Sequence, residues 1–393
     1  MINIQDKLKC SGCGACYSVC SQKCISMIED NEGFLYPKVD KDTCVNCALC
    51  DGTCPLNEEN NKKYGVVKSE IVQNKDSEIL RQSTSGGAFT PIAQYVLQRN
   101  GVVFGVEMDA ASNFVKHIKI DNEESLNKFR NSKYVQSYVG NTFDDAKQEL
   151  QKGRLVCFSG TPCQIQGLKN YLHKEYDNLV TVDVVCRGVP SPGVWKKYNE
   201  YLKRKGELGS VRFRDKSLGY QYSTMEVTYK DGKIERNGIE SDQWLRMFFS
   251  GMILRPSCPT CNFRSVERCS DFTIWDCFNV SDLTKDLDET KGATRMLIHT
   301  KRGQEIFDKV RDRFYVVDAD VNTVAVGITE KPSLNKRKGE FIQDYNKMSM
   351  EELLNKWFPI TFKVRTKKLT RRILNNVGLD IFVKKMKRKI MGR

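Results

Sequence analysis

Histidine and long apolar runs are scarce in this sequence. Only three of the 393 residues are histidines (His117, His173 and His299). Each falls singly in an expected strand or helix, which argues against histidine-centred catalysis or metal binding. No apolar run approaches the roughly 20 residues of a membrane-spanning helix. The opening segment MINIQDKLKC has neither a basic n-region nor an apolar h-region, so no signal peptide is expected. We therefore predict a globular cytoplasmic protein.

Acidic residues are almost absent from the C-terminal segment. Residues 362–393 contain twelve Lys or Arg and one acid, Asp380, a net charge of +11 that leaves +3 of the total +14 for the rest of the chain. Five apolar residues of 379–393 share an arc of about 100° on a helix; they are Leu379, Phe382, Val383, Met386 and Ile390. This composition suits an interfacial helix on an anionic membrane, peripheral to its inner face. The alternative is a solvated helix that docks on the body or a partner. No folded nucleic-acid-binding module accompanies the charge, so no nucleic-acid partner is expected.

Cysteine, in contrast, is abundant. Sixteen cysteines in a chain with no expected export signal indicate metal or redox chemistry rather than disulfides. The runs CSGCGACYSVC (10–20) and CVNCALCDGTC (44–54) both follow C-x2-C-x2-C-x3-C, typical of two-cluster 4Fe–4S ferredoxins, in which the fourth cysteine binds the other cluster. The expected ligands are Cys10, Cys13, Cys16 and Cys54 for the first cluster, and Cys44, Cys47, Cys50 and Cys20 for the second. Two zinc knuckles are the alternative, but they would not need four cysteines per run. Cys24 is expected to pack in the core.

A loop rich in serine and glycine follows a polar linker at 57–65. The residues that precede an expected helix with proline in its first turn are Arg81, Ser83, Ser85, Gly86 and Gly87. Such a loop offers N–H donors and a helix dipole suited to a phosphate group. The alternative is an ordinary capped helix. Downstream, RNSKYVQSY (130–138) shows no helix or strand period and includes Lys133, so we interpret it as a binding loop.

The segment 153–188 predicts a β-α-β unit. GRLVCFSG is expected to form a buried strand, TPCQIQGLKNYLHKEY a helix, and NLVTVDVVCRG a second, parallel strand. Cys163 then follows the C-terminal end of the first strand, and Cys186 lies at the end of the second. This is the sheet edge where α/β proteins bind ligands. Cys157 lies within the first strand and is expected to be a core thiol.

A further cysteine pair, Cys258-x2-Cys261, lies in RPSCPTCNFRSVERCSDF (255–272). Such a pair presents two sulfurs to one metal, which needs two more ligands. Cys163 and Cys186 would complete four thiolates for a third 4Fe–4S cluster. Two other cysteines could substitute for them, namely Cys269 and Cys277. Structural zinc bound by four thiolates stays open.

Six stretches between residues 80 and 300 carry a family resemblance. In order, they are STSGGAFT, SKYVQS, GTPCQIQGLKNYL, VDVVCRGVPSPGVWKKY, VRFRDKSLGY and CPTCNF…SDFTIWDCF. The region resembles the β subunit of the coenzyme F420-reducing hydrogenase and its relatives, among them formate dehydrogenase β subunits and a plant chlorophyll-cycle reductase. The resemblance implies FAD beside an iron–sulfur cluster, with Arg81, the loop 83–87 and Lys133 as FAD contacts. Arg187 stands where the family usually has histidine. Trp275 and Cys277 also replace the usual glycine and phenylalanine.

The expected architecture has three parts. An α+β bacterial-type ferredoxin domain (1–60) precedes an α/β flavin- and iron–sulfur-binding domain, in two portions at 61–150 and 151–335. A basic helical tail occupies 336–393.

A flavin exchanges two electrons as hydride, whereas a 4Fe–4S cluster carries one. The sequence therefore predicts an oxidoreductase that passes electrons between a hydride substrate, FAD and the clusters, and exchanges them with a redox partner protein or ferredoxin. A non-catalytic electron-transfer subunit serving a partner enzyme is the alternative, and a zinc-bearing scaffold is the third. Coenzyme F420 and NAD(P)H both stay open as substrates. No catalytic residue is assigned, because Asp183 and Asp276 near the expected active edge are equally suited to structural hydrogen bonds.

Overall fold

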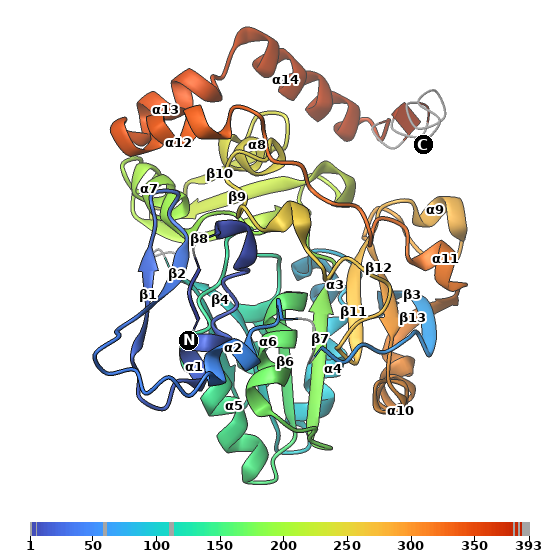
Figure 1. Cartoon of the computed structure of the whole chain (residues 1–393). Coiled ribbons are helices and arrows are strands. Elements are labelled where there is room, and N and C mark those ends of the chain that lie inside the picture. Colours follow the sequence, from blue (N-terminus) through green and yellow to red (C-terminus); the bar gives the residue numbers. More distant parts are fainter. Residues whose placement is uncertain are drawn as a thin grey trace.

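The structure is a computed structural model that describes residues 2–4, 6–57, 61–109, 114–379, 382–383 and 386 (Figure 1). Its N-terminal domain lies at the lower left of Figure 1, drawn in blue. The elements of this domain are η1 (Lys7–Lys9), α1 (Ala15–Val19), the antiparallel strands β1 (Ile25–Glu29) and β2 (Leu35–Val39), and α2 (Leu49–Thr53). Each of the two helices follows one cysteine loop.

The two cysteine loops share one backbone path. Gly12 and Gly14 have φ of 68° and 82°, and Asn46 and Ala48, at the matching places of the second loop, have 54° and 60°. Glycine adopts this left-handed conformation at little cost, whereas alanine does not. The second loop therefore keeps the geometry of the first despite a less suitable residue at 48.

An eight-stranded mixed sheet forms the centre of the molecule, in the order β13-β3-β12-β11-β7-β6-β4-β5. The strands are β3 (Lys68–Asn74), β4 (Val102–Asp109), β5 (Phe114–Ile120), β6 (Val156–Gly160), β7 (Leu179–Val184), β11 (Phe272–Cys277), β12 (Ala293–Ile298) and β13 (Phe314–Asp318). The parallel neighbours are β4 and β6, β6 and β7, and β7 and β11, and the other pairs are antiparallel.

Helices cover both faces of this sheet. The helices are α3 (Ser77–Gln82), α4 (Phe89–Leu97), α5 (Thr142–Gln151), α6 (Pro162–Leu172) and α10 (Lys301–Val310). Side chains alternate between the two faces along each strand. Thus Cys157 packs with α4 and α10 on one face, while Val156 and Phe158 pack with α5 and α6 on the other. The N-terminal domain extends the second layer, because Cys13 and Ala15 join the core around α6.

A second, three-stranded antiparallel sheet lies beside the first (upper part of Figure 1), in the order β10-β9-β8. It packs with four helices around buried Trp195 and Trp244. These elements are α7 (Pro192–Lys203), β8 (Leu208–Asp215), β9 (Thr224–Tyr229), β10 (Ile234–Gly238), α8 (Gln243–Phe249), α12 (Lys338–Lys347) and α13 (Met350–Trp357). Phe341 and Leu353 are fully buried in this core. The stretch 338–358 is therefore part of the body, although we expected the tail to begin at 336.

The remaining elements are short connections and a final helix. They are η3 (Glu124–Phe129), η4 (Tyr220–Tyr222), η5 (Cys258–Thr260), α9 (Val280–Leu283), η6 (Arg311–Arg313), α11 (Val321–Val324) and α14 (Phe362–Asn376). Helix α14 runs across the top of the view in Figure 1 and has no buried residue. Most of the expected amphipathic segment 379–393, including Ile390, lies outside the described residues. Within the described part of the chain, no helix is both long and apolar enough to span a bilayer.

The β-α-β prediction for 153–188 is confirmed. β6 and β7 are parallel and α6 connects them. Thr161 caps α6 through its side chain, Gln164 returns the bond, and Pro162 occupies the first turn. The expected boundary at residue 150 falls within the last turn of α5, a helix that packs against β6. The domain division stays a prediction in this respect.

Candidate functional site

The cysteines of the N-terminal domain form two neighbourhoods. Cys10, Cys13 and Cys16 are buried, and the charge of Cys54 acts on both Cys13 and Cys16, which places these four thiols together. Burial, followed by the charges of Cys10 and Cys54, raises the pKa of Cys16 to about 12. Crowded buried thiols therefore resist ionisation unless a metal supplies positive charge.

The second neighbourhood contains Cys20, Cys24 and Cys44. Cys24 is buried, as expected for a packing residue, but its Sγ lies 3.3 Å from Cys20 Sγ. Cys44 lies close enough for its charge to raise the pKa of Cys24 as well. Nearby, the Ile2 N–H donates to Cys50 Sγ at 3.2 Å. N–H donors to sulfur are typical of iron–sulfur sites.

A buried arginine joins this domain to the sheet domain. Arg255 donates to Cys10 O at 2.7 Å, to Leu35 O at 2.9 Å and to Gln136 Oε1 at 2.9 Å. Gln136 in turn donates through Nε2 to Ser11 O at 2.9 Å. No pattern in the sequence signalled this contact, because Arg255 and Cys10 are 245 positions apart.

Gly167 brings the first cysteine loop against α6. A Cβ atom at this position would lie 3.2 Å from Cys13 Sγ and 3.3 Å from Ala15 Cβ. Gly167 is one helical turn after Cys163. The first cysteine neighbourhood and Cys163 therefore lie on the same side of one helix, close enough for the Cys163 charge to act on Cys13.

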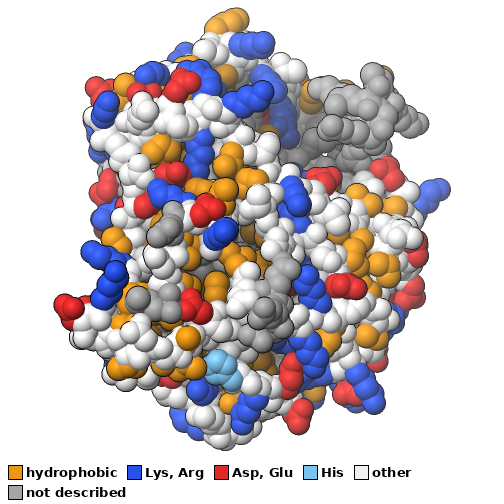
Figure 2. Space-filling model, viewed as in Figure 1, with side chains coloured by type: hydrophobic (Ala, Val, Ile, Leu, Met, Phe, Trp, Pro, Cys, Tyr) orange, Lys and Arg blue, Asp and Glu red, His pale blue; other side chains and the backbone are white. Residues whose placement is uncertain are grey.

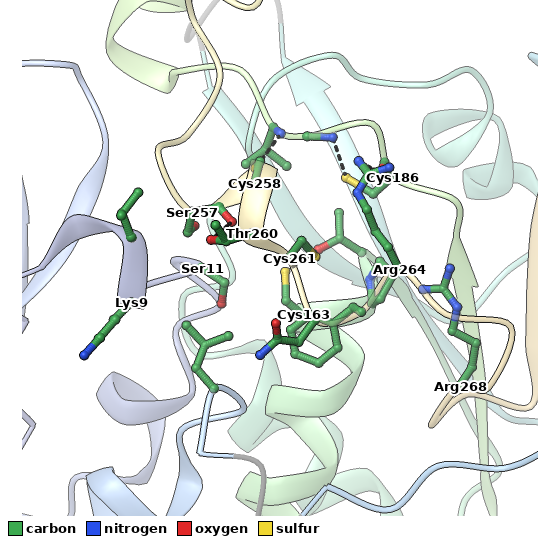
Figure 3. Close-up of a pocket in the computed structure, with 18 of the residues that line it drawn as sticks. Lys9, Ser11, Cys163, Cys186, Ser257, Cys258, Thr260, Cys261, Arg264 and Arg268 are labelled. Atoms are coloured by element: carbon green, nitrogen blue, oxygen red, sulfur yellow. Dashed lines mark hydrogen bonds between the residues drawn. The ribbon is translucent and has the colours of Figure 1, made fainter. Parts of the chain in front are cut away.

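The four cysteines expected to form a third metal site line one cavity of about 590 Å³. Cys163 lies in the first turn of α6, Cys186 two residues after β7, and Cys258 and Cys261 at the ends of η5 (Figure 3). The other wall includes Lys9 and Ser11 of the N-terminal domain. In the described part of the chain, no three His, Cys, Asp or Glu side chains already converge as a metal-binding set. The thiols thus surround a space rather than a single point.

Backbone and hydroxyl groups point at these thiols. Gly188 N–H donates to Cys186 Sγ and Val189 N–H to Cys258 Sγ, each at 3.4 Å (dashed lines in Figure 3). Thr161 Oγ1 lies 3.2 Å from Cys163 Sγ. Burial and then neighbouring thiol charges raise the pKa of Cys163 to about 12. This donor set of four thiols with N–H support fits an iron–sulfur cluster.

The alternative cysteines lie elsewhere. Cys269 and Cys277 are both buried, in separate hydrophobic clusters, and neither lines the cavity. Cys157 is buried within β6, as expected. Of the arginines nearby, Arg187 is exposed and pairs with Glu330, whereas the Arg264 Nη2 donates to Cys186 O at 2.5 Å. Arg264 and Arg268 also line the cavity and place positive charge beside the thiols.

The residues expected to contact FAD lie away from this cavity. Ser85 Oγ is 2.8 Å from Thr294 Oγ1, to which the Gly86 N–H also donates. Ser83 donates its hydroxyl to Ile79 O, and Arg81 is exposed and pairs with Glu78. The FAD contacts at Arg81, 83–87 and Lys133 stay a prediction.

A cluster of four cations lies beside that loop, and only Lys133 among them was expected from the sequence. It comprises Lys133, Arg212, Arg214 and Lys216. Lys216 Nζ donates to Leu80 O and Ser85 O, which fixes the loop, and burial lowers its pKa to about 7. Burial, followed by the charge of Arg212, lowers the pKa of Lys133 to about 7. Arg214 Nη2 is buried and has no hydrogen-bond partner within the described part of the chain. Asp215 pairs with Arg212 and Asp276 with Arg214, so the acids balance only part of the positive charge. An anion would offset the rest, and the cluster therefore fits a diphosphate group.

Asp276 and Asp183 are the two carboxylates that the sequence placed near the expected active edge. Tyr220 donates to Asp276 Oδ1 at 2.9 Å, and Arg214 Nη1 lies 3.4 Å from Asp276 Oδ2. Asp183 is fully buried and accepts a hydrogen bond from Ser270 at 3.0 Å. Both carboxylates thus have structural partners.

Comparisons with known proteins match the N-terminal domain and the sheet domain to two different families. Residues 153–323 match the family described as the C terminus of the coenzyme F420 hydrogenase/dehydrogenase beta subunit, and residues 9–57 match the 4Fe-4S dicluster domain. An uncharacterised ferredoxin of Methanocaldococcus jannaschii is 43% identical over 54 residues, 14% of this chain and 69% of that protein. A chain of the F420-reducing [NiFe] hydrogenase complex from Methanosarcina barkeri is similar in structure, with a TM-score of 0.44 and 16% identity, over 75% of this chain and 94% of that chain.

Proposed function

The chain belongs to the coenzyme F420 hydrogenase/dehydrogenase beta subunit family and carries an N-terminal 4Fe-4S dicluster ferredoxin domain, and on this premise we propose that it is an iron–sulfur flavoprotein oxidoreductase. It would pass electrons between a hydride substrate, FAD and 4Fe–4S clusters. The observation that carries the proposal is the cavity lined by Cys163, Cys186, Cys258 and Cys261. This cavity lies next to the buried cysteine loop of the ferredoxin domain.

A third 4Fe–4S cluster would be held by these four thiolates. Gly188 and Val189 would donate their N–H groups to two of the sulfurs, and Arg264 would offset the negative charge of the cluster. Gly167 supports a short path to the first ferredoxin cluster, because its missing side chain lets Cys13 approach α6. Zinc bound by four thiolates is the competing occupant.

FAD would supply the exchange between a two-electron hydride and single electrons. The cation cluster of Lys133, Arg212, Arg214 and Lys216 supports binding of its diphosphate. In that role, the two lysines would be protonated when the anion is bound, because the negative charge raises their lowered pKa values. Arg214 would use its Nη2 atom, which has no hydrogen-bond partner among the residues that the structure describes.

A non-catalytic electron-transfer subunit is the second candidate function. The chain matches a family of beta subunits. This match favours the electron-transfer function, because a subunit by definition works with a partner. Turnover separates the two functions. The isolated chain would reduce or oxidise coenzyme F420, NAD(P)H or an artificial dye if it is an enzyme, and would exchange electrons only with a partner protein if it is not.

The first experiment is anaerobic purification with iron, sulfide, zinc and flavin quantified on one sample. The proposal expects about twelve irons per chain from three clusters, with one FAD. About eight irons and no flavin would leave only the ferredoxin part of the proposal. About eight irons with one zinc would assign the four-cysteine cavity to zinc.

We also propose that α14 binds an anionic membrane surface. Figure 2 shows Lys and Arg side chains gathered at the top of the view, where α14 lies. Its basic side holds it on the body, since Arg371 pairs with Glu240 at 2.9 Å. Its apolar residues instead face outward, with Phe362, Leu369 and Ile373 exposed by 85%, 61% and 53%. Lys363, Arg365 and Lys367 of the same helix are exposed instead of facing the body. Exposed cations beside an apolar stripe suit anionic lipid.

Sedimentation with phosphatidylglycerol vesicles tests this. The triple variant F362S/L369S/I373S should lose binding, and Val67→Ser, an exposed apolar residue on another surface, should keep it. Equal binding of the parent chain to neutral phosphatidylcholine vesicles would contradict the role of charge, and unchanged binding of the triple variant would contradict the role of α14.

A further inference from the structure

The two cysteine loops of the ferredoxin domain are alike in backbone but opposite in exposure. We name residues 11–15 the inner loop and residues 45–49 the outer loop. In the inner loop, Cys13 and Ala15 are buried, with exposed fractions of only 7% and 0%. Every residue of the outer loop is exposed, including Cys47. The same local geometry thus lies against the sheet domain in one place and faces solvent in the other.

The inner loop shows how this protein covers a cysteine loop across which electrons would pass. Gln136 donates to the backbone of Ser11, and Arg255 donates to Cys10 O. Gly167 lies against Cys13 without a side chain between them. The cover is therefore a close-packed surface with a few donors for loop carbonyls. Electron transfer becomes faster as the distance between two redox centres decreases. Close packing against the inner loop therefore favours electron transfer between a cluster at this loop and a redox site in the sheet domain.

The outer loop carries larger apolar residues than the inner loop at matching places. Val45 and Leu49, exposed by 63% and 45%, stand where the inner loop has Ser11 and Ala15. Ala48 also holds a positive φ of 60°, a conformation that is costly for alanine. Two exposed apolar side chains thus lie two residues before and two residues after Cys47, which is expected to bind the second cluster.

We propose that the outer loop is the docking surface for an external one-electron carrier protein. The occupant would be an iron–sulfur or flavin carrier that presents an apolar surface around its own redox centre. One electron would leave the reduced second cluster, which is oxidised by one unit, and enter the carrier, which is reduced by one unit, or the reverse. The cluster nearer the cavity is enclosed by the inner loop, so the outer loop is the outward end of the path.

The charges beside the outer loop support apolar rather than electrostatic docking. Asp40, Lys41 and Asp42 precede it and are exposed, and Asp51 follows it and is half-buried, for a net charge of only −2. A strongly charged site would steer its partner and lose rate steeply with salt. Here we expect a rate that changes little with ionic strength. A patch centred on five residues also suits the small interfaces of transient electron-transfer complexes.

Docking at the outer loop rests on the proposed function only through the two ferredoxin clusters, and on neither FAD nor the third cluster. Its test is therefore independent of them. Rapid mixing under anaerobic conditions would measure reduction of the oxidised protein by a reduced two-cluster bacterial ferredoxin, by a reduced flavodoxin and by reduced methyl viologen. The small viologen needs no docking surface and reports whether the clusters are intact.

The test variant is V45E/L49E and the control is V67E/I234E, which places the same charges at two exposed apolar residues elsewhere. Reduction of V45E/L49E by the faster protein carrier should slow about tenfold, the loss typical of charges placed in an interface core. Its reduction by viologen and its iron content should match the parent protein. The control should match the parent protein with all three reductants.

A second variant guards against a folding defect. V45S/L49A gives the outer loop the residues of the inner loop and adds no charge, so it should retain its clusters and slow with the carrier by a smaller factor. If neither protein carrier reduces the parent faster than V45E/L49E, or if the control slows equally, the proposal is overturned. Failure of FAD or third-cluster binding would leave this result unchanged, because it uses only the ferredoxin clusters.

Discussion

Arg255 offers the most direct test of how the ferredoxin domain is held on the sheet domain. It is 1% exposed and makes three hydrogen bonds of 2.7–2.9 Å, to Cys10 O, Leu35 O and Gln136 Oε1. Its guanidinium also lies 4.3 Å from the centroid of the Tyr36 ring. Arg255→Met keeps an unbranched side chain but removes these donors, and the backbone carbonyls of buried Cys10 and half-buried Leu35 lose this partner.

We expect this change to lower the free energy of unfolding by about 4 kcal/mol. A hydrogen bond from a charged donor contributes on the order of 1.5–3 kcal/mol. Three such bonds together would contribute more than about 4 kcal/mol. The expected loss is smaller, because removing the guanidinium also removes the cost of burying its charge. A loss of about 4 kcal/mol corresponds to a decrease in Tm of roughly 8 °C for a domain of this size.

The assay is anaerobic thermal unfolding, followed by circular dichroism and by the visible absorption of the clusters. Arg313→Met is the matched control, because the Arg313 side chain is 60% exposed and its ion pair with Asp312 spans 3.9 Å. This change should alter the free energy of unfolding by less than about 0.5 kcal/mol. Arg255→Lys should fall between the two, since one ammonium cannot serve three acceptors. Equal Tm values for Arg255→Met and Arg313→Met would refute the reasoning.

The cavity and the cation cluster give three more expected outcomes. Cys163→Ser should reduce the iron content from about twelve to about eight per chain, measured by colorimetric assay, whereas Cys269→Ser should leave it unchanged; equal loss would contradict the assignment. Gly167→Leu should slow electron transfer between the third cluster and the first, measured by freeze-quench EPR, with both clusters still present. In the flavin-free protein, the free energy of unfolding should rise with pH between pH 7 and 9. Burial lowers the pKa of Lys133 and Lys216 from 10.5 to about 7, so the unfolded chain binds more protons in this interval. Denaturant titrations should show the slope, and the double Lys→Met variant should lack it.

Local spacing made much of the fold and the metal chemistry predictable. The two C-x2-C-x2-C-x3-C runs need only a short turn to bring thiols together, so the ferredoxin domain could be identified without any long-range contact. The apolar run of β6, the capped start of α6 and the apolar run of β7 similarly predicted parallel strands. Because such strands end at one sheet edge, Cys163 and Cys186 could be placed together.

The spacing could not predict which groups gather from distant parts of the chain. Lys216 reaches Ser85 O from 131 positions away, and neither residue carries a local pattern that signals the other. The burial of α12 and α13 was also missed, because their charged faces resemble the basic segment that follows, whereas Phe341 and Leu353 fill a core that is formed mainly by α7, α8 and β8–β10.

The amino-acid sequence indicated the cysteines as candidate metal ligands and the strands and helix that carry Cys163 and Cys186. Both inferences depend on residues that are close together in the sequence. Which cysteine loop is covered, in contrast, is set by tertiary packing. The inner and outer loops have the same cysteine spacing and backbone path, and they differ because Gly167, Gln136 and Arg255 meet one of them and not the other. That difference depends on packing between segments more than a hundred residues apart, where local periodicity carries no information.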